Sequence, residues 1–197
     1  MNTTTHALVA LACFQKKSVP RSGWVALIGS ILPDAFLAVF VAVMLINRTP
    51  ADQIWEVEYY KEPWTTIGSI SNSFPIWFFL LGLGIILKNR SNYLGTLITI
   101  FSLSGLSHLV LDFFTHSDDA HLHFWPISSR RFESPFSYWD FDHNAVYVMP
   151  IEGLIVLYAS SVLWKRTSSK IYKALLVVSI IIGSAQLISP IIRLISE

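Results

Sequence analysis

The sequence has little charge, and this scarcity excludes more classes of function than any motif does. Charged residues make up 14% of the 197 residues, whereas a soluble domain has about 25%. Hydrophobic residues reach 53%, and the mean hydropathy is +0.52. Because the net charge is only +1, no general attraction to nucleic acid is expected. The composition predicts an integral membrane protein with lipid as its surroundings.

Cysteine and internal repeats are also scarce. Cys13 is the only cysteine, so no disulfide can form within the chain. The sequence contains no repeat period, no low-complexity tract and no linker that would separate two domains. We therefore expect residues 1–197 to form a single integral-membrane domain.

Long uncharged runs are abundant. About 20 apolar residues cross the hydrocarbon core as a helix. Five runs approach or exceed this length: residues 22–47, 67–87, 93–111, 145–164 and 174–192. The apolar stretch at residues 6–14 is too short to span and predicts a short N-terminal helix. The expected fold class is all-α, a polytopic membrane bundle of about five transmembrane helices.

The basic residues predict an orientation, because cytoplasmic connections carry an excess of Lys and Arg. Nine of the 14 basic residues fall on one side of the membrane if the turn at residues 16–21 is cytoplasmic. The long connections at residues 48–66 and 116–144 then lie on the outer face. Long connections in compact proteins are often functional. We expect the second one to fold back as a lid, with Trp125, Phe132 and Trp139 buried.

Histidine is concentrated in one part of the chain. Five of the six histidines lie within residues 108–143, together with several aspartates. Imidazoles and carboxylates together suit zinc and related divalent ions. The clearest element is His108-x-x-x-Asp112-x-x-x-His116, whose members share one stripe of a helix. These groups could bind an ion, or they could only cap the helix, pair with each other or face water.

Asp34 lies inside the first apolar run, where ionisable groups are costly and usually face a partner or a cavity. Pro33 should kink or break the helix there and free backbone carbonyls. The N-terminal helix and the first half of this run form a hairpin with nearly equal arms, which should bring His6 beside Asp34. Asp34 could be a ligand or a base, or it could be paired for structural reasons alone.

The second long connection offers further candidates. His121 and His123 point to one side if the segment is extended, a spacing found in metal sites. Arg130 and Arg131 could bind a phosphate or carboxylate of a substrate through forked hydrogen bonds, or they could contact lipid headgroups. Glu152, inside the fourth run, could orient a ligating histidine or have a structural partner.

The order of these elements resembles a family of bacterial inner-membrane proteins labelled membrane-bound metal-dependent hydrolases. The resemblance covers residues 5–126 and rests on four motifs: Thr5-His6-Ala7-Leu8, the Gly-x-x-x-Pro-Asp element from Gly29 to Asp34, His108-x-x-x-Asp112, and Trp125-Pro126. It implies a helical protein of the bacterial inner membrane with a His/Asp metal centre. More distantly, the pattern is similar to the site of all-helical zinc-dependent phospholipases C, which also takes His and Asp from several helices.

The chain departs from this family pattern in two places. Phe36 stands where many members have a second aspartate, and residues 48–66 contain no histidine. One usual metal ligand is then missing, or a histidine of the second long connection supplies it. We expect the metal-ligand candidates to converge on one site: His6, Asp34, His108 and Asp112, with at least one of His116, His123 and His143.

Two functions compete. In the first, one or two divalent ions, zinc or manganese, activate a water for hydrolysis of an ester or phosphoester. Asp34 or Asp112 accepts the proton, and Arg130 or Arg131 stabilises the developing negative charge. A site at membrane depth favours a lipid-linked substrate.

In the second, the protein is not an enzyme and binds or transports a metal ion or protons. Transport would spread ionisable groups along a path through several spans. Here they gather toward one end, which favours the hydrolase.

Overall fold

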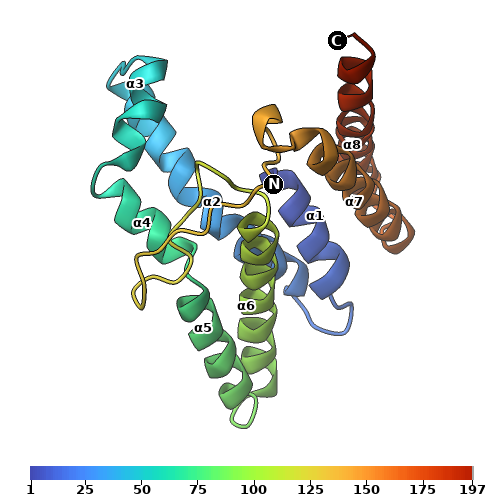
Figure 1. Cartoon of the computed structure of the whole chain (residues 1–197). Coiled ribbons are helices and arrows are strands. Elements are labelled where there is room, and N and C mark those ends of the chain that lie inside the picture. Colours follow the sequence, from blue (N-terminus) through green and yellow to red (C-terminus); the bar gives the residue numbers. More distant parts are fainter. Residues whose placement is uncertain (197) are drawn as a thin grey trace.

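The structure of the chain, a computed structural model, describes residues 1–196, and its secondary structure over that range is helical (Figure 1). The α-helices are α1 (Thr3–Phe14), α2 (Ser22–Ile46), α3 (Ala51–Glu56), α4 (Trp64–Ser71), α5 (Phe74–Leu87), α6 (Asn92–Phe113), α7 (Ala145–Arg166) and α8 (Lys170–Ser196). Two short 3-10 helices are η1 (Glu58–Tyr60) and η2 (Phe141–His143). The predicted all-α membrane bundle is confirmed.

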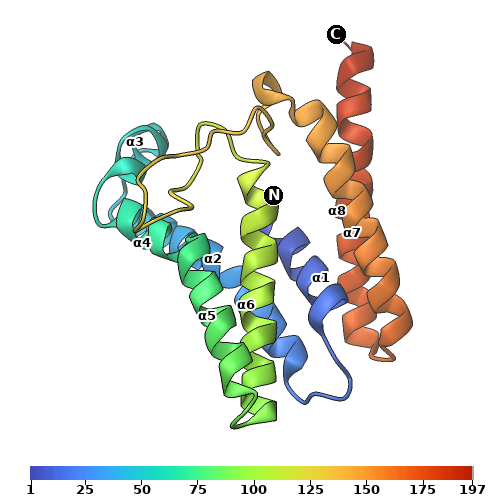
Figure 2. The same cartoon turned by 60° about the horizontal axis from the view of Figure 1, so that its bottom comes forward.

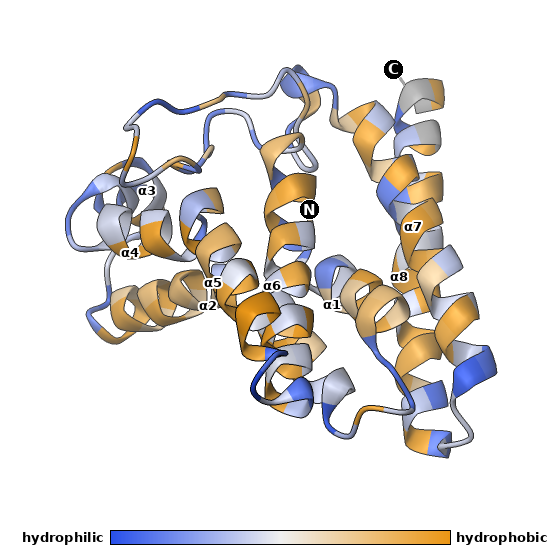
Figure 3. Ribbon diagram, turned by 90° about the horizontal axis from the view of Figure 1, so that it is seen from below, coloured by the Kyte–Doolittle hydropathy of each residue, from blue (hydrophilic) through white to orange (hydrophobic). Residues whose placement is uncertain are grey.

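Four helices of the described chain are long and apolar enough to cross a membrane, namely α2, α6, α7 and the Lys170–Pro190 part of α8. These helices are predominantly hydrophobic (Figure 3). Large apolar side chains on them are exposed, including Val39, Tyr158 and Ile171. Such surfaces are stable when lipid rather than water covers them. The fifth expected span, residues 67–87, consists of α4 and α5, which are bent by 41° relative to each other.

A continuous helix over residues 67–87 was therefore the wrong expectation, and Pro75 supplies the physical reason. Proline has no backbone N–H, so the carbonyl of Ser71 loses its helical donor. The indole Nε1 of Trp77 donates to this carbonyl instead, at 2.8 Å. Ser73 then caps α5, because its Oγ accepts a hydrogen bond from the backbone N–H of Ile76.

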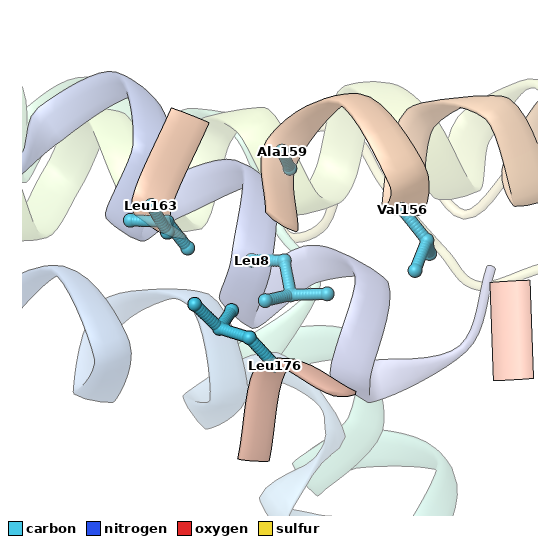
Figure 4. Close-up of a cluster of buried hydrophobic side chains, with 5 residues drawn as sticks. All are labelled: Leu8, Val156, Ala159, Leu163 and Leu176. Carbon is cyan, nitrogen blue, oxygen red and sulfur yellow. The ribbon is translucent and has the colours of Figure 1, made fainter. Parts of the chain in front are cut away.

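Helix α1 joins the two halves of the bundle. It contacts α2 and α6 on one side and α7 on the other, while α7 and α8 form a hairpin (Figure 2). On the α7 side, Leu8 packs in a cluster with Val156, Ala159, Leu163 and Leu176 (Figure 4). On the opposite side, a second cluster contains Ala10, Ala26 and Ile100. Burial of these apolar surfaces fixes α1, and with it His6, between the membrane helices.

Helices α2 and α6 approach each other closely at Gly29. A Cβ at this position would lie 2.4 Å from the backbone oxygen of Phe101, so only glycine fits. Pro33 does not end α2, which continues from Ser22 to Ile46. The carbonyl of Pro33 accepts a hydrogen bond from Nδ2 of Asn72 at 3.3 Å, which ties α2 to the break between α4 and α5.

The connection after α6 runs over the bundle, but its aromatic residues are not buried as expected. Phe132 and Trp139 are exposed, and Trp125 is half-buried. The backbone instead fastens the segment, since Phe74 N–H donates to His123 O at 2.8 Å. Aromatic rings are stable at a membrane interface with one side wet, whereas backbone polar groups need hydrogen-bond partners. This difference explains the wrong expectation.

The α5–α6 interface gives a test of the packing. Trp77 is buried, and a Cβ at Gly105 would lie 2.2 Å from its Cζ3 atom. Gly105→Ala should therefore lower the free energy of unfolding by about 1–3 kcal/mol, as overpacking does in other cores. Thermal unfolding in mild detergent measures this loss.

The matched control is Gly82→Ala in α5, because a Cβ there meets nothing within 4 Å. Alanine favours helix over glycine, so this variant should equal the wild type or gain up to about 1 kcal/mol. Equal stability of the two variants would contradict the close packing of Trp77 on Gly105.

The predicted orientation is tested by cysteine labelling in a Cys13→Ser background. Ser128 lies in the connection between α6 and α7, and Ser168 lies in the turn between α7 and α8. A single helix that spans the membrane separates them, so Ser128→Cys should react from the outside and Ser168→Cys only after permeabilisation. Labelling of both from one side would contradict the topology.

Candidate metal centre

Ionisable side chains gather where α1, α2 and α6 meet below the connection that follows α6. His6 comes from α1, Asp34 from α2, and His108 and Asp112 from the last turns of α6. His6 and Asp112 are each 1% exposed and His108 is 0% exposed. Charged groups are rarely buried to this degree unless they are paired or bind a metal. This cluster is therefore the strongest candidate for a functional site.

Asp112 is the shared partner in the cluster. Its Oδ1 lies 2.9 Å from Nε2 of His6, and its Oδ2 lies 2.9 Å from Nε2 of His108. Oδ2 is also 3.5 Å from Nε2 of His116. The amino group of Met1 donates to Oδ1 at 2.5 Å. His6, His108 and Asp112 each offer one ligand atom, and these three atoms lie within 4.8 Å of one another. This spacing allows them to bind a single ion.

Asp34 approaches the same Nε2 atom of His108 as Asp112 does. Its Oδ1 lies 3.4 Å from Nε2 of His108, and its Oδ2 accepts a hydrogen bond from Thr3 Oγ1 at 2.5 Å. The rings of His6 and His108 are stacked, with centroids 3.7 Å apart. The N-terminal hairpin therefore brings His6 to Asp112 and His108, and Asp34 to His108.

Several ring nitrogens at this site are buried and have no hydrogen-bond partner. They are both ring nitrogens of His6 and of His116, and Nε2 of His108 and of His123. Three of them lie close to Asp112 oxygens, but their directions do not satisfy hydrogen-bond geometry. Native structures rarely leave buried polar atoms unsatisfied without a functional reason. These nitrogen and oxygen atoms lie close together without hydrogen-bonding to each other. This is the arrangement expected of side chains that bind one ion in common.

The Nδ1 atoms of His108 and His123 show which ring nitrogen of each imidazole carries the hydrogen. Nδ1 of His108 lies 2.7 Å from the carbonyl oxygen of Ser30, and Nδ1 of His123 lies 3.0 Å from that of Asn72. A carbonyl oxygen only accepts, so each Nδ1 must be the donor. In the neutral rings Nε2 then has a free lone pair, as in the usual arrangement of metal-binding histidines, which donate their other N–H to a carbonyl or carboxylate.

Both of these carbonyls lie three residues before a proline. Ser30 precedes Pro33 in α2, and Asn72 precedes Pro75 at the break between α4 and α5. Proline disturbs the hydrogen-bond ladder of the preceding turn. These disturbed turns offer acceptors to side chains from elsewhere in the chain. Sequence analysis missed Asn72, although Pro75 inside an apolar run indicates a break.

The outer edge of the cluster contains His116 and Asp119. Nδ1 of His116 lies 2.9 Å from Oδ2 of Asp119, which also accepts a hydrogen bond from Nε1 of Trp139 at 3.2 Å. Burial alone would lower the pKa of His116, but Asp112 and Asp119 raise it to about 9. Sequence analysis did not single out Asp119, because its spacing of three from His116 lies in an irregular segment.

His121 lies beside His116, and His123 lies beside His121. The ring centroids of His116 and His121 are 5.7 Å apart, and those of His121 and His123 are 5.9 Å apart. Burial lowers the pKa of His121 to about 3 and that of His123 to about 4. Both imidazoles are therefore neutral at physiological pH, which is the form that binds metal ions.

Glu152 of α7 binds the beginning of α1. Its Oε1 accepts hydrogen bonds from the backbone N–H of Asn2 at 2.8 Å, from Asn2 Nδ2 at 3.0 Å and from Thr5 Oγ1 at 2.6 Å. The Asn2 side chain provides no N-cap hydrogen bond for α1. A carboxylate near the first turn of a helix also favours the helix dipole. Glu152 therefore positions His6 through the helix rather than by touching its ring.

The structure places three other candidates apart from Asp112. His143 lies in a second group, with its Nδ1 2.7 Å from Oδ2 of Asp140 and with Asp118 nearby. Arg130 is exposed. The guanidinium of Arg131 lies 5.9 Å from the ring centroid of Tyr60 and lines a small recess that His121 also lines.

Comparison with known proteins places the chain in a family of bacterial membrane proteins. A search of curated proteins and a search of solved structures each gave no match. The family model described as YdjM inner membrane protein matches residues 1–190, which include the four candidate membrane spans and the whole His/Asp cluster. Together with the apolar helices, this match shows an integral protein of the inner membrane. The chain therefore belongs to the YdjM inner membrane protein family.

Proposed function

We propose that the protein is a metal-dependent hydrolase that cleaves an ester or phosphoester at the membrane. The observation that carries this proposal is the crowding of the buried Nε2 atoms of His6 and His108 around the Asp112 carboxylate, at 2.9 Å but without hydrogen-bond geometry. His6, His108 and Asp112 would bind a divalent ion, zinc or manganese. Three protein ligands are typical of catalytic zinc sites, which keep a position open for water. When bound, the ion lowers the pKa of that water and polarises the substrate.

The residues around these ligands have distinct roles in the proposed reaction. Asp34 is less buried than Asp112, and its Oδ1 lies 3.4 Å from Nε2 of His108. Asp34 is therefore the better placed carboxylate to accept a proton from the water, while Asp112 is occupied as a ligand. Thr3 Oγ1 donates to the other oxygen of Asp34 and holds the carboxylate in this orientation.

His123 would extend the ligand set as a neutral imidazole, and His116 would do so after it releases its proton on metal binding. Nε2 of each is buried and unpartnered. With Asp112 between the two groups of histidines, these nitrogens could supply further ligands to one ion or bind a second. Arg131, beside His121, would bind a negatively charged part of the substrate, with Arg130 further out in the same segment.

Binding or transport without catalysis is the competing function. A transporter needs ionisable groups along a path through the bundle. In the described chain, the buried ionisable groups adjoin the end of α6 or the beginning of α1: His6, His108, Asp112, His116, His123 and Glu152. This one-sided distribution favours a reaction site.

The protein purified in mild detergent should contain one or two equivalents of zinc or manganese. Asp112→Asn should abolish binding and leave the helical bundle folded, because it removes the ligand charge without changing side-chain volume. Metal analysis together with circular dichroism measures both properties. Asp52→Asn is the matched control, since Asp52 is exposed on α3 and belongs to neither His/Asp group.

Activity is tested on the same preparations with a chromogenic phosphodiester and a chromogenic ester. The wild type should lose activity with a chelator and regain it with added metal. Asp34→Asn should retain metal and lose about 10²–10⁴-fold in rate, the usual contribution of a general base. Metal-free protein that binds none on titration, or metal-loaded protein inactive on both substrates, would overturn the proposal.

Glu152→Gln tests how α1 positions His6. The amide accepts hydrogen bonds less strongly than the carboxylate that now holds Asn2 and Thr5. Metal affinity should fall by about 10–100-fold, as it does when supporting partners of ligands are changed. Glu133→Gln, at an exposed carboxylate, should leave affinity unchanged. Equal affinities of both variants would show that Glu152 has no positioning role.

A further inference from the structure

An apolar cavity of about 260 Å³ lies between α6 and α7, directly beside the candidate metal centre. Its walls come from the last turns of α6, the first turns of α7 and the N-terminus. The principal wall residues are Met1, Val110, Phe114, Thr115, Tyr147 and Ile151.

The cavity opens toward the lipid-facing side of the bundle. Val110, Phe114, Tyr147 and Ile151 are exposed, although all four line it. Helix α7 packs mainly against α8 and α1, and not against α6 (Figure 2). The gap beside α6 is therefore not filled by another helix of the described chain.

The cavity lies at a definite depth. Helix α7 has 22 residues, which is a length of about 33 Å, and the hydrocarbon core is about 30 Å thick. The wall residues of α7 come from its first two turns. The cavity is thus at the level where acyl chains meet lipid headgroups.

Met1 and Thr115 connect the cavity to the metal centre. Both line the cavity, and the Met1 amino group donates to Thr115 Oγ1 at 3.2 Å and to Asp112 Oδ1 at 2.5 Å. A molecule with its apolar part in the cavity would have its polar end beside Asp112. Water is a poor occupant, because a stable buried water needs two to four polar partners.

We propose that this cavity binds an acyl chain of a bilayer lipid and presents the ester or phosphoester at its polar end to the His6/His108/Asp112 site. The inference rests on the proposed function and names its substrate class, a lipid taken sideways from the membrane. The occupant is a lipid because the cavity is apolar, opens from membrane-spanning helices and lies at headgroup depth.

The test uses the full chain in vesicles of phosphatidylglycerol and phosphatidylethanolamine. A small fraction of the phosphatidylglycerol has a photoactivatable diazirine on one acyl chain, and labelled peptides are mapped by mass spectrometry. Labelling should concentrate in residues 110–115 and 147–151. Labelling spread equally over the exposed face of α8, for example at Ile181, would overturn the proposal, as would a dimer cross-linked through residues 110–151.

Ile151→Trp should block the mouth of the cavity and reduce this labelling several-fold. Leu154→Trp is the matched control, because Leu154 is on the same helix and 55% exposed, against 56% for Ile151, but does not line the cavity. Val110→Trp narrows the cavity from the opposite wall and should act like Ile151→Trp, which guards against a folding defect of one variant. Unchanged labelling in both cavity variants would contradict the inference.

Activity separates failure of this inference from failure of the proposed function. Ile151→Trp should raise KM for a two-chain phospholipid more than KM for a water-soluble phosphodiester, whereas Leu154→Trp, outside the cavity, should change neither. Asp112→Asn should lose both activities. Equal effects of Ile151→Trp on the two substrates would overturn the acyl-chain site alone, whereas absence of both activities in the metal-loaded wild type would overturn the hydrolase.

Discussion

The buried carboxylate of Asp112 is the constraint on which the arrangement of the candidate metal centre depends. It lies near the end of a membrane-spanning helix, is 1% exposed, and needs positive or polar partners on both oxygens. The chain supplies them from distant segments: the N-terminus and His6 at one oxygen, and His108 and His116 at the other. Helix α1 is too short to span a membrane, and it is enclosed by α2, α6 and α7. This position places the Met1 amino group and the His6 ring at Asp112.

The sequence allows much of this to be predicted, because membrane spans and helical stripes are local properties. Apolar runs of about 20 residues indicate helices, and the spacing of four places His108, Asp112 and His116 on one face. The hairpin arms bring both His6 and Asp34 to His108 of α6. Their proximity is seen in the structure, while their roles as ligands and base are part of the proposal.

What the sequence did not reveal depends on irregular backbone. The acceptors for His108 and His123 are the carbonyls of Ser30 and Asn72. A proline indicates that carbonyls near it are available, but the sequence does not show which side chain will reach them. The exposure of Phe132 and Trp139 was also missed, because composition does not distinguish a buried lid from an interfacial aromatic belt. His143 lies in the same connection as His116, but its ring pairs with Asp140 instead of Asp112. The irregular backbone of the connection determines this pairing, and the spacing of the histidines does not predict it.

The most direct test of the central claim is the X-ray absorption spectrum of the zinc-loaded protein at the zinc edge. The account predicts nitrogen and oxygen neighbours at about 2.0–2.2 Å, with the outer scattering of at least two imidazoles and one imidazole fewer in His6→Ala. A spectrum with only oxygen neighbours and no imidazole scattering would place zinc on exposed carboxylates. It would contradict a metal centre built on His6, His108 and Asp112.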